Sequence, residues 1–123
     1  NSGIPITMVG LDVTMRVPID RSHLKTIKNV GTPLTETLAR LIEIWWDFLK
    51  SDSSPMHDPL AVSYCIKPEF LKTINCKVLI ETVGKYTAGQ TIVIPDEDSS
   101  IKVTYDVDEQ GFLRFLMSRV CSH

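Results

Sequence analysis

A single apolar strand near the start of the chain limits the folds open to it. Residues 4–9 read IPITMV, and Gly10 follows immediately. An apolar strand that stops at glycine and leads into a helix is typical of an α/β layer, in which sites gather at strand ends. Such a strand needs hydrogen-bonding neighbours on its edges. Three helices, three strands and a last helix are expected after it, so its flanking strands are expected outside these 123 residues.

Helical signals dominate the first half of the chain. A helix over 21–30 is expected behind Asp20, whose carboxylate can cap it. Thr32 followed by Pro33 predicts the start of the longest helix, roughly 33–50, because proline is favoured at the first helical position. The apolar residues that recur at helical spacing there predict its core face. They are Leu34, Leu38, Leu41, Ile42, Trp45 and Leu49.

Strand signals gather in the second half. The predicted fold class is therefore α/β: the C-terminal part of an open, mostly parallel sheet flanked by helices, with a β-hairpin appended. Residues 1–123 are expected to form one partial domain. The elements expected after the long helix are a loop over 51–55, a helix over 59–66, hairpin strands over 77–83 and 91–94, a strand over 101–107 and a helix capped by Asp108.

Composition excludes several classes of partner. Hydrophobic residues make up 43% of the chain, which suffices for a buried core and argues against disorder. The net charge of −2 argues against strong binding of nucleic acid or an anionic membrane, so neither is expected as a partner. No apolar run is long enough to span a membrane. Cys65, Cys76 and Cys121 lack a C-x-x-C spacing, which is typical of free thiols in a reducing compartment, and a cytoplasmic location is expected.

The stretch Met56-His57-Asp58-Pro59 places an imidazole beside a carboxylate, between a Ser-rich loop and an apolar run. A residue before proline favours the extended conformation of a helix cap, so Asp58 can be explained as the N-cap of the helix over 59–66. A carboxylate has two oxygens, and one could accept a helix N–H while the other binds a hard cation such as Ca²⁺. Spacing leaves two interpretations open: a cap only, or a metal ligand with His57 as an acid–base or substrate-contact group.

Two further pairs are candidates for a pocket. Trp45 and Trp46 point roughly 100° apart on a helix, so at least one is expected in the core while the other could reach a pocket wall. The indole that reaches the pocket could stack on a base, and helical spacing does not decide which of the two it is. Asp12 and Thr14 follow the first strand, where they either line a cleft or shape the turn.

Four stretches carry motifs in a distinctive order. They are PITMVGLDVT (5–14), SPMHDPLAVSYCIKPEFL (54–71), KVLIETVGKYTAGQTIVIPDE (77–97) and VTYDVDEQGFLRFL (103–116). Together they resemble the C-terminal part of the inosine-uridine-preferring nucleoside hydrolases, which act in nucleoside salvage. The H-D-P-x-A-V element and the E-T-x-G-x-x-T-x-G-Q-T hairpin carry most of this resemblance, and the helical middle, 20–50, carries little.

The resemblance implies Ca²⁺-dependent cleavage of the N-glycosidic bond of a purine or pyrimidine ribonucleoside, giving base and ribose. It implies that Asp58 is a direct Ca²⁺ ligand and that His57 lies by the leaving base, which it contacts or protonates. Trp45 would line the base pocket, and the complete enzyme would be a homo-oligomer. If the transition state resembles an oxocarbenium ion, departure of the base is a large part of the barrier, and a donor near the base nitrogen helps.

The family's Asp-rich motif, D-x-D-P-G-x-D-D, is absent from these residues, and so are the Asn and Glu residues that hold the ribose. The start, Asn1-Ser2-Gly3, lacks Met and the layout of a signal peptide. We therefore expect the C-terminal portion of a nucleoside hydrolase, inactive alone because one carboxylate cannot supply the roughly six to eight oxygens that Ca²⁺ takes. Two alternatives stay open: a non-catalytic interaction fragment with an exposed sheet edge, and a small α/β domain in which Asp58 is only a cap.

Overall fold

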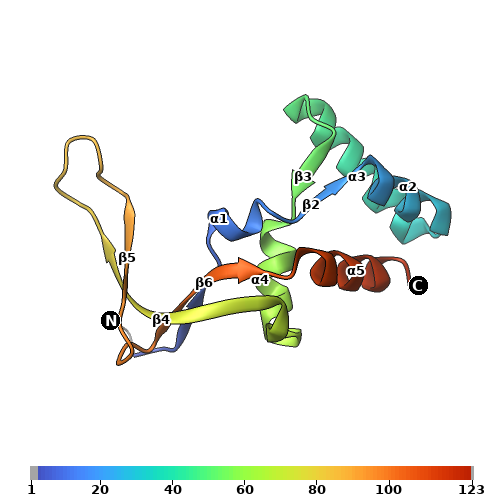
Figure 1. Cartoon of the computed structure of the whole chain (residues 1–123). Helices are drawn as coiled ribbons and strands as arrows, with labels where there is room; N and C mark the ends of the chain where they lie inside the picture. Colours follow the sequence, from blue (N-terminus) through green and yellow to red (C-terminus); the bar gives the residue numbers. More distant parts are fainter. Residues whose placement is uncertain (1–2, 123) are drawn as a thin grey trace.

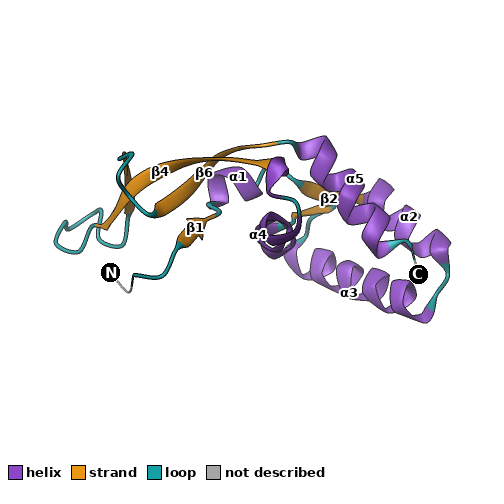
Figure 2. Ribbon diagram, turned by 90° about the horizontal axis from the view of Figure 1, so that it is seen from below, coloured by secondary structure: helices purple, strands orange, loops and turns teal. Residues whose placement is uncertain are grey.

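A computed structural model describes residues 3–122, which form an elongated molecule (Figure 1). Its elements run in the order β1 (Ile6–Met8), α1 (Leu11–Thr14), β2 (Pro18–Asp20), α2 (Arg21–Val30), α3 (Pro33–Leu49), β3 (Ser53–Pro55), α4 (His57–Ile66), the 3₁₀ turn η1 (Pro68–Phe70), β4 (Leu71–Ile80), β5 (Thr91–Pro95), β6 (Ile101–Val107) and α5 (Glu109–Val120). The strands of the larger sheet gather at one end, and α2, α3 and α5 lie at the other (Figure 2). The hairpin of β4 and β5 projects from the sheet end (Figure 1).

The main sheet is mixed, with the strand order β1-β6-β4-β5. The strand β1 pairs parallel with β6, so that Ile6 lies opposite Ile101 and Met8 opposite Val103. The strand β4 pairs antiparallel with both β6 and β5. The predicted α/β class and the appended hairpin are confirmed. The first hairpin strand is longer than predicted, because β4 begins at Leu71 and also pairs with β6.

Three helices begin at the predicted caps, and at the last of them, α5, the Asp108 carboxylate accepts a hydrogen bond from the Gly111 backbone N–H. The carboxylate of Asp20 accepts hydrogen bonds from the backbone N–H groups of Ser22 and His23 at the start of α2. The hydroxyl of Thr32 accepts from the backbone N–H of Thr35 at the start of α3, with Pro33 at the first helical position. These local hydrogen bonds satisfy N–H groups that have no partner within the helix, which is why the sequence alone indicates these three helix starts.

The prediction of a loop over 51–55 is wrong in part, because Ser53–Pro55 forms β3 and pairs antiparallel with β2. Ile19 lies opposite the buried Ser54 in this two-stranded sheet. The backbone N–H of Met56 donates to the carbonyl of Val17, which extends the junction toward α4. A Ser-rich segment has little intrinsic strand preference, so the pairing depends on a partner far away in the sequence.

The face of α3 that was predicted to pack on the core is largely exposed. Leu34, Leu41 and Trp45 are each at least half exposed, whereas Ala39 and Trp46 are buried. The helix is apolar on more than one face, and periodicity could not decide which of them this chain buries. None of the helices in residues 3–122 combines the length and apolarity needed to cross a membrane.

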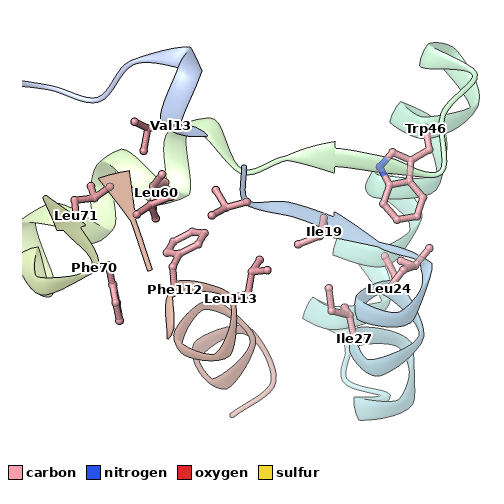
Figure 3. Close-up of a cluster of buried hydrophobic side chains, with 13 residues drawn as sticks. Val13, Ile19, Leu24, Ile27, Trp46, Leu60, Phe70, Leu71, Phe112 and Leu113 are labelled. Atoms are coloured by element: carbon pink, nitrogen blue, oxygen red, sulfur yellow. The ribbon is translucent and has the colours of Figure 1, made fainter. Parts of the chain in front are cut away.

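The buried core runs from the sheet to the helical end. Figure 3 shows Phe112 and Leu113 of α5 between Leu60 of α4 on one side and Ile19 of β2 on the other. Val13 of α1 lies beside Leu60 in the same view and belongs to the same buried cluster. The short helix α1 is therefore held against α4 by apolar packing.

Charged side chains attach the segment after α1 to the sheet. The guanidinium of Arg16 lies 3.0 Å from the Asp106 carboxylate and 2.9 Å from that of Glu109. The Lys72 ammonium lies 2.9 Å from the second Asp106 oxygen. Hydrogen bonds from Lys72, and then from Arg16, lower the pKa of Asp106 from its ordinary 3.8 to about 2. The carboxylate of Asp106 thus joins β4, β6 and the end of α1.

This network predicts a pH-dependent loss of stability on replacing Asp106 with Asn. A carboxyl whose pKa is depressed in the folded state stabilises that state above its unfolded pKa, and this contribution is lost as the pH falls through the folded pKa. We expect Asp106→Asn to lower the free energy of unfolding at neutral pH, and its difference from wild type to shrink between pH 3.8 and about 2.

Urea denaturation followed by circular dichroism would measure this difference. Asp98→Asn is the matched control, because the Asp98 carboxylate has no ion pair among the described residues. An equal, pH-independent effect of both substitutions would contradict a role for the Asp106 network.

Candidate site at the start of helix α4

The helix α4 begins two residues earlier than the cap interpretation required. Met56 is its N-cap, His57 is its first residue, and the first helical hydrogen bond runs from the Leu60 N–H to the Met56 carbonyl. The prediction that Asp58 caps this helix is wrong, because no side chain caps it. Pro59 at the third helical position costs no hydrogen bond, since the first four N–H groups of a helix lack an internal partner.

The two polar residues of this first turn differ in their surroundings. The Asp58 side chain is exposed and makes no hydrogen bond or ion pair among residues 3–122. The His57 ring is half-buried, and its Nδ1 lies 2.6 Å from the Thr14 hydroxyl. The carboxylate is therefore free to bind a ligand, while the imidazole is held by its neighbour in α1.

The short helix α1 brings Thr14 to this place. It begins behind Gly10, directly after β1, and its Val13 and Thr14 are buried. In open α/β sheets, ligands bind beyond the carboxyl ends of the strands, and this is where α1 and the first turn of α4 meet. Sequence reasoning placed Thr14 either in a cleft or in a turn. It did not pair Thr14 with His57, because no sequence signal links residues so far apart.

The two tryptophans take different positions on α3. Trp46 is 3% exposed, and its indole N–H donates to the buried Ser54 hydroxyl at 3.0 Å, so the expectation that at least one indole is in the core is confirmed. Trp45 is 50% exposed and stacks on Phe48 with ring centroids 5.7 Å apart. No hydrogen bond or ring contact in the described chain joins Trp45 to His57 or Asp58.

The residues of this segment do not form a Ca²⁺ site by themselves. Among residues 3–122, no three His, Cys, Asp or Glu side chains are grouped so that they could hold a metal ion. Asp58 offers a single carboxylate, whereas Ca²⁺ takes roughly six to eight oxygen ligands. Any Ca²⁺ bound by Asp58 therefore needs ligands from outside the described residues.

The fold and the His-Asp pair define an α/β protein with a polar site beyond the end of a parallel strand. The family model described as inosine-uridine preferring nucleoside hydrolase matches residues 1–114, and the chain belongs to this family. The resemblance drawn from the motifs is thereby confirmed.

Named relatives include enzymes for both kinds of base. The pyrimidine-specific ribonucleoside hydrolase RihA of Photobacterium profundum is 35% identical, with 99% of this chain and 42% of that protein covered. RihA of Salmonella paratyphi B is 34% identical, with coverages of 97% and 41%. The purine-preferring ribonucleoside hydrolase from Gardnerella vaginalis superimposes with a TM-score of 0.86 at 26% identity, with coverages of 98% and 41%. The chain thus spans about two fifths of these proteins.

The arrangement of α4 predicts that Asp58 contributes little to folding. Since Asp58 forms no cap hydrogen bond, we expect Asp58→Ala without Ca²⁺ to lower the free energy of unfolding by less than about 1 kcal/mol. Asp20→Ala is the matched comparison, because Asp20 does cap α2, and its loss should cost about 0.5–2 kcal/mol. Urea denaturation in the presence of a chelator would compare the two. A larger cost for Asp58→Ala would restore the cap interpretation.

Proposed function

We propose that the protein carrying this chain is a ribonucleoside hydrolase, which cleaves the N-glycosidic bond of a purine or pyrimidine ribonucleoside to base and ribose. The observation that carries the proposal is the placement of His57 and Asp58 on one turn beyond the end of β1, within a chain of the nucleoside hydrolase family. Residues 1–123 would be the C-terminal portion of the catalytic domain. The Asn and Glu residues that hold the ribose in the family are not among these residues. The ribose would therefore be held by other parts of the protein.

In this proposal His57 faces the leaving base and Asp58 supplies one oxygen ligand to a Ca²⁺ ion completed by residues outside the described chain. The free, exposed carboxylate of Asp58 supports the metal role. A hydrogen-bond donor beside the base nitrogen favours its departure, because negative charge develops there as the bond breaks. Trp45 is proposed to stack on the base, which its exposed indole would permit once the rest of the protein closes the pocket.

The proposed location is the cytoplasm, with a homo-oligomeric complete enzyme. Cys65, Cys76 and Cys121 are all free thiols, which suits a reducing compartment. The exposed apolar side chains of α3 support burial against further protein, either the rest of the polypeptide or a second subunit.

The central test is ribose release from uridine, cytidine, inosine and adenosine by the full-length protein. We expect His57→Ala to lower kcat about 10²–10⁴-fold, since a positioned donor contributes about this much. Asp58→Ala should weaken Ca²⁺ binding, measured by calorimetry, as well as activity. His23→Ala is the matched control, because His23 belongs to the capping box of α2 and not to the proposed site. The His23→Ala protein should hydrolyse nucleosides as fast as wild type. Unchanged turnover in His57→Ala would remove its proposed role.

The isolated segment should be inactive. Purified 1–123 is expected to release no ribose and to bind Ca²⁺ only weakly, because the described residues hold no cluster of metal ligands. Its exposed apolar surface should make it self-associate in size-exclusion chromatography. Clear hydrolysis by this segment alone would contradict the proposal. A stable assembly of a full-length protein that hydrolyses no nucleoside would instead favour the second candidate, a non-catalytic interaction protein.

A further inference from the structure

The buried hydroxyl of Thr14 has two hydrogen-bonding contacts in the described chain. Thr14 is 2% exposed, so water does not compete freely for its side chain. Its Oγ1 lies 2.6 Å from His57 Nδ1 and 3.5 Å from the Leu11 carbonyl oxygen. The first distance is that of a strong hydrogen bond, and the second is at the limit of one.

The single proton of this hydroxyl has one favourable acceptor. The carbonyl of Leu11 already accepts the Met15 N–H at 2.9 Å, and at 3.5 Å from the Thr14 hydroxyl it is a much weaker acceptor than His57 Nδ1 at 2.6 Å. An imidazole nitrogen that faces a hydroxyl either donates to it or accepts from it. With the hydroxyl proton directed at the 2.6 Å contact, Nδ1 of His57 is the acceptor, and the ring proton of the neutral imidazole resides on Nε2.

We propose that Thr14 is a positioning residue that holds His57 in the Nε2–H tautomer and aims this N–H at the leaving base. The inference rests on the proposed function and adds the group that orients its donor. The packing of Val13 beside Leu60 supports it, because this contact fixes α1 against α4 and so fixes the distance between the two side chains (Figure 3). The arrangement parallels metal-binding histidines, in which the partner of one ring nitrogen sets the state of the other.

The chemical step needs no change in the protonation of His57. The C1′–N bond breaks and its electron pair stays on the base nitrogen, while a water oxygen bonds to C1′ and releases one proton to the surrounding water. The Nε2–H of His57 donates a hydrogen bond to the base nitrogen as negative charge develops there. The base then takes a proton from water, so that nucleoside and water give base and ribose.

The test compares two Thr14 variants in the full-length protein with two leaving groups. Thr14→Val removes the hydroxyl at nearly constant size, and Thr14→Ser keeps it. We expect Thr14→Val to lower kcat for a nucleoside about 10–100-fold with little change in KM, as for the loss or misplacement of one oriented donor. Thr14→Ser should recover most of this loss. Neither variant should much change kcat for hydrolysis of p-nitrophenyl riboside, because its nitrophenolate group leaves without a hydrogen-bond donor.

A matched control removes a buried hydroxyl that has no orienting role. Thr104 in β6 is also 2% exposed, and its Oγ1 has no hydrogen-bond partner in the described residues. Thr104→Val should therefore leave nucleoside hydrolysis unchanged. Thermal unfolding of all variants would show whether a loss of activity reflects a loss of folded protein.

A spectroscopic measurement tests the orientation without activity. The ¹⁵N shifts of the His57 ring should show the Nε2–H tautomer in the wild type and in Thr14→Ser, and a mixture in Thr14→Val. A wild-type ring protonated at Nδ1 would overturn the inference, and so would equal losses on both substrates in a folded Thr14→Val protein. If His57→Ala is impaired but Thr14→Val is not, this inference fails alone. If His57→Ala retains full turnover, the proposed role of His57 fails.

Discussion

The parallel pairing of β1 with β6 is the contact on which the rest of the structure depends. It joins opposite ends of the chain, with Ile6 opposite Ile101, and it sets the register in which α1 leaves the sheet. From that register follow the ion pairs of Arg16 with Asp106 and Glu109, and the burial of Val13 beside Leu60. A slip of one residue would turn each side chain of β1 to the opposite face and would move α1 away from α4.

The polar site combines a fixed group with a free one. The imidazole of His57 is half-buried and bonded to Thr14, whereas the carboxylate of Asp58 is exposed and contacts no polar partner in residues 3–122. This difference suits the division of roles in the proposed reaction. A hydrogen-bond donor must be held at the correct angle, and a metal ligand must stay available for an ion whose other ligands come from elsewhere.

Much of the apolar surface is left uncovered by residues 3–122. Phe48 is 75% exposed, and Leu41 lies on the same side of α3. The strand β1 has a strand partner on only one edge among the described residues. Edges and apolar faces of this kind are normally covered in a stable protein. The chain spans about two fifths of each relative, so three fifths of those proteins have no counterpart in these residues.

The sequence by itself determined the elements whose signals are local. Asp20 and Thr32 cap their helices as predicted, and alternating residues indicate β6 with its correct bounds. The family motifs also led to His57 and Asp58. Tertiary structure alone decided the pairing of β2 with β3, the buried face of α3, the start of α4 at His57 and the contact between Thr14 and His57. A cap or an alternating strand depends on neighbours within a few residues. Strand pairing, the choice between two apolar faces and a hydrogen bond across the fold depend on partners that only the folded chain brings together.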